Sequence, residues 1–270
     1  MFRLPDDRPG SPAAVSVAPP GLLRVYAHVQ ASTDTADLTG LRVLLIADLL
    51  ARAAELGGLQ VLTTRVFTGD PAGKAAVEHA AAAFGVHPPV PPVADSAGAW
   101  PGGAADVHLA ADGTIANDDR GGILIHSAAA RLGHDARPGD DTTAGMLGAH
   151  DPLAVRLALM SLPRNQPAEL TAGQLADATR TLGEWRYRVA RWAEYPSGAI
   201  PEPSAAVLRA AFGNLDMVAV LELLAGLAAD ETVPPGPRFE TFVYADRVLG
   251  LELPRDIGRL PAVPSAGHHR

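Results

Sequence analysis

Cysteine is absent from the 270-residue chain, and lysine is almost absent, since Lys74 is the single example among 22 basic residues. The lack of cysteine excludes disulfide bonds, thiolate nucleophiles and cysteine-ligated zinc. Any metal site must therefore use histidine and carboxylate ligands. Sites that need several lysine side chains are excluded as well.

An excess of positive charge and long apolar runs are also missing. The formal net charge is -8 at pH 7, so we expect no broad basic surface and no tRNA partner. No stretch approaches the roughly 20 apolar residues of a membrane-spanning helix, and the N-terminus does not resemble a secretory signal. We therefore expect a cytoplasmic protein without membrane binding, whose 47% apolar content suffices for a substantial core.

The first half has the pattern of an α/β domain. Residues 22–29 form a short apolar run typical of a buried strand, residues 41–56 carry apolar side chains at helical spacing, and residues 59–67 suit a second strand. Strand, helix and strand in this order predict a right-handed βαβ unit. Ligands of such sheets bind beyond the carboxyl ends of the strands, so we expect a site between His28 and Gly40.

The remaining segments complete the predicted organisation. Residues 1–20 read as a tail or an edge segment, and residues 84–122, rich in proline and glycine, contain either short strands or lost structure. From Asp151 onward the pattern is helical, with predicted helices beginning after Asp151, running from the Thr171–Gln174 capping box to about residue 193, and covering 204–212, 217–227 and 238–249. The predicted fold is α/β: a reduced Rossmann-like domain (21–150) followed by an α-helical bundle (151–270).

Two stretches carry a family resemblance. Residues 23–67 are similar to the strand, His-x-Gly-His loop, helix and second strand of the class I cysteine-activating ligases, which are cysteinyl-tRNA synthetase and mycothiol ligase. Residues 151–161 resemble the helix that follows the Lys-Met-Ser-Lys-Ser loop of that family, and the later helices are similar in order. The resemblance implies a class I synthetase-type fold with an adenylate-forming site.

The signature positions of that family are substituted here. His28 stands where the family has a zinc-binding cysteine, and residues 37–40, Asp-Leu-Thr-Gly, replace both signature histidines. The loop at 133–140 lacks the signature lysines but contains Arg137. Because phosphoryl chemistry depends on positioned cationic and donor groups, these losses predict impaired adenylation. The resemblance assigns degenerate nucleotide-binding positions to Asp37, Thr39, Gly40 and Arg137, and a substrate pocket to Tyr26 and His28.

Metal binding has two interpretations. In the first, His28 and His126 are two zinc ligands, and Asp37, His134 or His150 completes the site. In the second, each histidine replaces a cysteine whose metal has been lost. We favour the loss of zinc. His126 aligns either with a second zinc-ligand region of the family or with the strand before the signature loop. A magnesium ion beside ATP is a further option, with hard oxygen ligands from Asp135, Asp140 and Asp141, although a solvated acidic loop is the simpler interpretation.

Three functional hypotheses follow. The first is a non-aminoacylating paralogue, a pseudoenzyme that binds a small molecule or a protein partner in the old cleft. The alternative is an ATP-dependent amino-acid-activating ligase that uses Arg137 and the helix start at Thr39–Gly40, where backbone N–H groups can bind an anion. The third is a structural homo-oligomer built on the helical half. Trp185, Tyr187 and Trp192 suit either base stacking or a helix core, and we favour the core.

Overall fold

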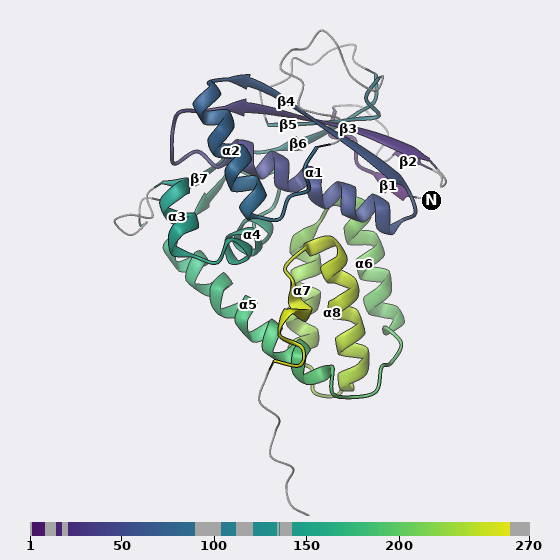
Figure 1. Cartoon of the computed structure of the whole chain (residues 1–270). Helices are drawn as coiled ribbons and strands as arrows, with labels where there is room; N and C mark the ends of the chain where they lie inside the picture. Colours follow the sequence, from purple (N-terminus) through teal and green to yellow (C-terminus); the bar gives the residue numbers. More distant parts are fainter. Residues whose placement is uncertain are drawn as a thin grey trace, which may run out of the picture.

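The computed structural model describes residues 2–8, 15–17, 21–89, 104–111, 121–133, 135 and 142–259. Its centre is a four-stranded parallel sheet (Figure 1). The strands follow the order β4 (Gln60–Gly69), β3 (Leu22–Ala31), β5 (Val107–Ala111) and β6 (Ile123–Ser127). From β3 the chain crosses to β4 on one side and later to β5 on the other. The boundary between β3 and β5 is thus the point where the strand order reverses, which is where α/β sheets bind ligands.

Two small sheets flank this one. The strands β1 (Phe2–Leu4) and β2 (Val15–Val17) pair antiparallel, and β7 (Ala130–Leu132) and β8 (Ala168–Leu170) pair parallel. The first pair lies within the segment expected to be a tail or an edge. The second joins the end of the α/β part to the beginning of the helical part.

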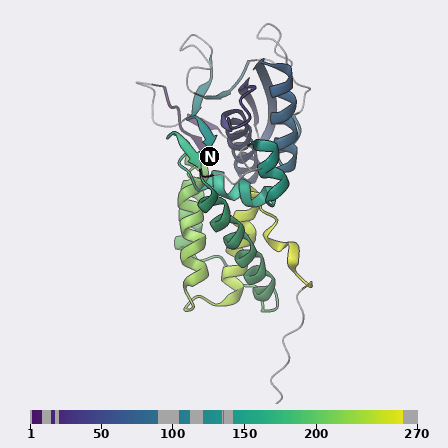
Figure 2. The same cartoon turned by 90° about the vertical axis from the view of Figure 1, so that its left-hand side faces the viewer.

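The helix α1 (Thr39–Leu56) connects β3 to β4 and occupies the middle of the molecule. Every residue from Gly40 to Leu50 is buried, because the sheet covers one side of the helix and the helical bundle covers the other (Figure 1). Most of these buried residues are apolar, which is typical of a helix covered on both sides, and the charged exceptions are Arg42 and Asp48. The helix α2 (Pro71–Ala83) packs beside α1 on the same side of the sheet (Figures 1 and 2).

Side chains of β3 alternate between two different environments. Val25, Ala27 and Val29 belong to the hydrophobic core beneath α1. The strand period of two places Tyr26 and His28 on the other face. No helix among the described residues covers that face (Figure 1). The sheet is therefore apolar toward α1 and carries polar rings on its opposite face.

The second half is helical, as predicted. The helices are α3 (Thr143–Ala149), α4 (Pro152–Met160), α5 (Ala172–Trp192), α6 (Glu202–Asn214), α7 (Met217–Ala229) and α8 (Pro235–Leu249), followed by a 3₁₀ turn at Leu253–Asp256. The predicted caps are confirmed: Leu153 N donates to Asp151 Oδ1 at 2.9 Å, and Thr171 and Gln174 form a capping box. The starts of α4 and α5 could be predicted from the sequence because capping is an interaction between residues close together in the chain.

The sequence patterns did not predict the helices α2 and α3 or the strands β7 and β8. Of the two alternatives for residues 84–122, a short strand is confirmed at Val107–Ala111. The helix α2 is rich in alanine and its apolar periodicity is weak, although the Asp70–Pro71 start was a usable signal. One hydrophobic core extends through both halves of the chain, and the predicted boundary at residue 150 stays a prediction.

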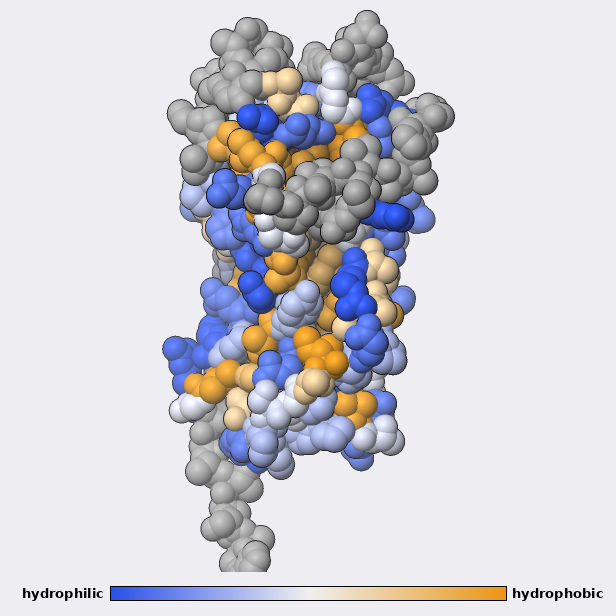
Figure 3. Space-filling model, turned by 90° about the vertical axis from the view of Figure 1, so that its right-hand side faces the viewer, coloured by the Kyte–Doolittle hydropathy of each residue, from blue (hydrophilic) through white to orange (hydrophobic). Residues whose placement is uncertain are grey.

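In the described ranges, no helix is long and apolar enough to cross a bilayer. On the face drawn in Figure 3, the apolar residues of the described chain lie in small groups separated by hydrophilic ones.

Candidate functional site

A cavity of about 450 Å³ lies beyond the carboxyl ends of β3 and β5, at the starts of α1 and α2. Its lining comprises His28, Gln30, Ala31, Ser32, Thr33, Asp37, Thr39, Gly40, Val43, Asp70 and Ala111. The structure thus brings together His28, Asp37, Thr39 and Gly40, four of the residues predicted from the sequence. Their role in binding stays a prediction.

Asp37 and Thr39 hold the start of α1. Thr39 N donates to Asp37 Oδ1 at 2.8 Å. The Thr39 hydroxyl donates to Ala130 O at 3.2 Å and accepts from Ala130 N at 3.1 Å, so it fastens α1 to β7. A carboxylate consequently occupies the positive end of the α1 dipole, where an incoming phosphate would meet a negative charge.

Asp70 repeats this arrangement at the start of α2. Its Oδ1 accepts from Ala72 N at 2.8 Å and from Gly73 N at 3.1 Å. The cavity is therefore bounded by two helix N-termini that each carry their own carboxylate. Coulomb attraction at this site favours a cationic or neutral polar ligand over an anion.

A pair of buried histidines lies at the inner end of the site. His28 Nε2 and His108 Nδ1 are 2.9 Å apart, so one ring donates and the other accepts when both are neutral. The His108 ring also stacks on Tyr26, with 6.1 Å between centroids. Burial raises the pKa of the Tyr26 hydroxyl. Tyr26 and His28, the predicted substrate-pocket residues, are thus neighbours through His108, although Tyr26 does not line the cavity.

His108 was missed because it lies in the irregular stretch of the sequence. The apolar run Val107–Ala111 was the available signal. The parallel register places Tyr26 opposite His108. No short-range pattern connects two positions so far apart in the chain.

The two histidines considered as a zinc pair, His28 and His126, lie on strands that are not neighbours in the sheet. His28 pairs with Ala110 in the β3–β5 register, and Ala110 pairs with His126 in the β5–β6 register, so two strand spacings, about 10 Å, separate the two backbones. Within the described ranges, no three histidine or acidic side chains cluster in a way that could hold a metal ion. His150 ends α3 at a separate place.

Several other predicted residues have different positions or cannot be placed. His134, Arg137, Asp140 and Asp141 lie outside the described residues. Asp135 is exposed, and its Oδ1 accepts from Ala172 N at 3.2 Å at the start of α5.

The aromatic residues of α5 belong mainly to the core. Trp185 and Trp192 are buried edge-on against Phe242, with centroids 5.5 and 5.1 Å away. The core interpretation is confirmed for both tryptophans, whereas Tyr187 is exposed. Base stacking on the two tryptophans is excluded because their rings are covered.

No protein-family model and no curated protein matches the chain. The relationship to the cysteine-activating ligases therefore rests on the sequence pattern and stays a prediction.

Proposed function

We propose that this protein is a non-aminoacylating relative of the cysteine-activating ligases, and that it binds a small cationic or neutral polar molecule at the carboxyl ends of β3 and β5. The observation that carries the proposal is the pair of carboxylates at the cavity: Asp70 caps α2, and Asp37 accepts a hydrogen bond from Thr39 N at the start of α1. A ligand amine can pair with the remaining oxygens of these carboxylates, and Gln30 and Ser32 offer further polar groups in the lining.

The alternative, an adenylate-forming ligase, has less support. It would use the N–H groups at the start of α1 to bind phosphate, but Asp37 already accepts from Thr39 N there. The Thr39 hydroxyl is engaged with Ala130 in the same way. A cavity of about 450 Å³ also fits a small molecule better than a protein partner.

Thermal unfolding with three probes tests the proposal: cysteamine, which is cationic; cysteine, a zwitterion; and ATP with magnesium. We expect cysteamine to raise Tm most and ATP to have no effect. Ligand at tenfold its dissociation constant adds about 1.4 kcal/mol, or roughly 3 to 5 °C for a chain of this length.

The matched control is the double variant Asp37→Asn, Asp70→Asn. Asparagine keeps the capping acceptor at both helix starts but removes the charge. Folding should persist while the shift with cysteamine disappears. Cysteine-dependent exchange between ATP and pyrophosphate, or a Tm increase with ATP that exceeds that with cysteamine, would refute the proposal.

A further inference from the structure

A second cavity, of about 370 Å³, lies where α1 meets the helical bundle. Three segments form its walls: α1 from Arg42 to Leu49, residues 159–165 at the end of α4 and in the following turn, and residues 214–218, which comprise the end of α6, a short turn and the start of α7. None of its lining residues is shared with the cavity at the carboxyl ends of β3 and β5. It is therefore a separate site.

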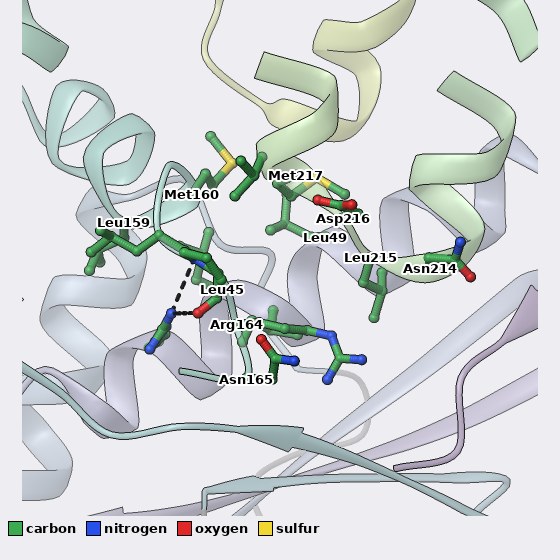
Figure 4. A pocket seen from close by; sticks show the side chains of 15 residues that line it. Leu45, Leu49, Leu159, Met160, Arg164, Asn165, Asn214, Leu215, Asp216 and Met217 are labelled. Atoms are coloured by element: carbon green, nitrogen blue, oxygen red, sulfur yellow. Dashed lines mark hydrogen bonds between the residues drawn. The ribbon is translucent and has the colours of Figure 1, made fainter. Parts of the chain in front are cut away.

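The floor of this second cavity is apolar and almost completely shielded from solvent. It consists of Leu45, Leu49, Leu159, Met160, Leu215 and Met217, each no more than 5% exposed. Figure 4 shows the two methionine side chains above Leu45, with Arg164 and Asn165 below it. Methionine adapts its shape easily, so this floor can close around an apolar group.

The rim of the cavity is polar. Asn165 and Asn214 are exposed there, and neither amide forms a hydrogen bond within the described part of the chain. Each amide therefore has both a donor and an acceptor available.

The charges at the rim are largely compensated. Arg164 contacts Asp7 twice, with Nη1 to Oδ2 at 2.6 Å and Nη2 to Oδ1 at 3.1 Å. Asp216 accepts from Ala219 N at 3.1 Å and lies at the positive end of α7. The available groups at the rim are thus mainly neutral donors and acceptors.

The turn between α6 and α7 is adapted to this cavity. Leu215 has φ 54°, ψ 35°, the left-handed conformation that glycine and asparagine adopt more easily. Gly213 and Asn214 directly precede it, yet leucine takes this position. Its side chain is buried in the floor, whereas Asn214 is exposed at the rim (Figure 4).

We propose that this cavity binds a small uncharged molecule with an apolar body and an amide or hydroxyl head group. The apolar body contacts the methionine and leucine floor, and the head group exchanges hydrogen bonds with Asn165 and Asn214. A volume of about 370 Å³ is in the usual range for small-molecule sites. The inference is independent of the proposed function, because the two sites share no residues.

Methionine methyl groups provide a direct test, since the chain has only four methionines. Two line the cavity, while Met146 is buried outside it and serves as an internal reference. The full-length protein, labelled with ¹³C in its methionine methyl groups, is titrated with hexanamide, hexanoate and hexylamine. Met160→Leu and Met217→Leu assign the two signals.

We expect hexanamide to shift the Met160 and Met217 signals saturably and to leave Met146 in place. Hexanoate and hexylamine, which share the apolar body, should bind about threefold to tenfold more weakly, as the loss of a hydrogen bond implies. Asn214→Ala and Asn165→Ala should each weaken hexanamide binding by a similar factor, and the exposed control Gln60→Ala should not.

Three results would overturn the proposal: no saturable shift at Met160 and Met217, equal affinity for the three head groups, or unchanged hexanamide binding in both asparagine variants. Because both asparagines are exposed, their variants should fold, and unchanged circular dichroism verifies this. The Asp37→Asn, Asp70→Asn variant, which should lose cysteamine binding at the first cavity, should still bind hexanamide at the second. A failure of one proposal can therefore be distinguished from a failure of the other.

Discussion

At the scale of a single residue, Asp48 shows how a charge is held inside α1. Its side chain has no exposed surface, and its Oδ2 accepts from Arg156 at 2.7 Å and from Arg52 at 2.8 Å. His87 N donates to Oδ1 at 3.1 Å. Burial by itself raises the pKa of Asp48, but the two arginines and the backbone donor outweigh it and hold this pKa below its usual range.

A lowered pKa stabilises the folded state above the ordinary aspartate value of about 3.9, and this stabilisation is lost as the pH falls through the folded-state pKa. We predict that Asp48→Asn lowers the free energy of unfolding by about 3 kcal/mol at pH 7, because it leaves the buried Arg156 without its carboxylate partner. The difference from wild type should shrink at pH 3. Urea unfolding at both pH values measures it, with exposed Asp177→Asn as a control. A difference independent of pH would contradict this.

At the scale of elements, the start of α2 is positioned by close backbone contact with the end of β3. A Cβ atom on Gly73 would lie 2.3 Å from Ser32 O, and this overlap cannot be relieved by a side-chain rotation. The contact places Asp70 and Ser32 in the same cavity lining. Glycine at this position is therefore needed for packing as well as for the site.

We predict opposite effects for two glycine-to-alanine variants. Gly73→Ala should destabilise the protein by about 1 to 3 kcal/mol, since the backbone must shift. Gly183→Ala, in α5 with open space around the added methyl group, should stabilise it by up to about 1 kcal/mol through helix propensity. Thermal unfolding compares the two. A Tm for Gly73→Ala at or above that of wild type would show that the close contact is absent.

At the scale of the whole molecule, Arg42 connects α1 to two segments, residues 128–129 before the predicted domain boundary at residue 150 and residues 162–166 after it. It is 1% exposed and donates to five carbonyl groups, those of Ala128, Ala129, Leu162, Pro163 and Gln166. Burial lowers the pKa of its guanidinium. Because α1 belongs to one core shared by both halves, we expect them to unfold together.

Calorimetry should show a single unfolding transition for the wild-type protein. Arg42→Met should lower the stability by about 3 kcal/mol or more, since five carbonyl groups around this buried side chain lose their donor together. Arg180→Met, which removes two exposed ion pairs, should change the stability by less than about 0.5 kcal/mol. Two separate transitions in the wild-type protein would show that the halves are independent.

Local features of this protein could be predicted from the sequence. The strand, helix and strand from Leu22 to Gly69 follow from apolar periodicity, and the start of α5 follows from its capping box. The expectation of a site between His28 and Gly40 depended only on where parallel strands end. Each of these features depends on interactions between residues close together in the chain, so it can be predicted from the sequence pattern.

Only the tertiary structure decided which distant groups meet. His108 lies beside His28 because the parallel register of β3 and β5 brings together residues 80 positions apart. Asp70 joins Asp37 at one cavity because α2 folds back on β3, and the second cavity exists because three segments converge on α1. Such contacts depend on packing across the whole core, so local sequence patterns determined most of the elements, and the packing of these elements determined which residues line the two cavities.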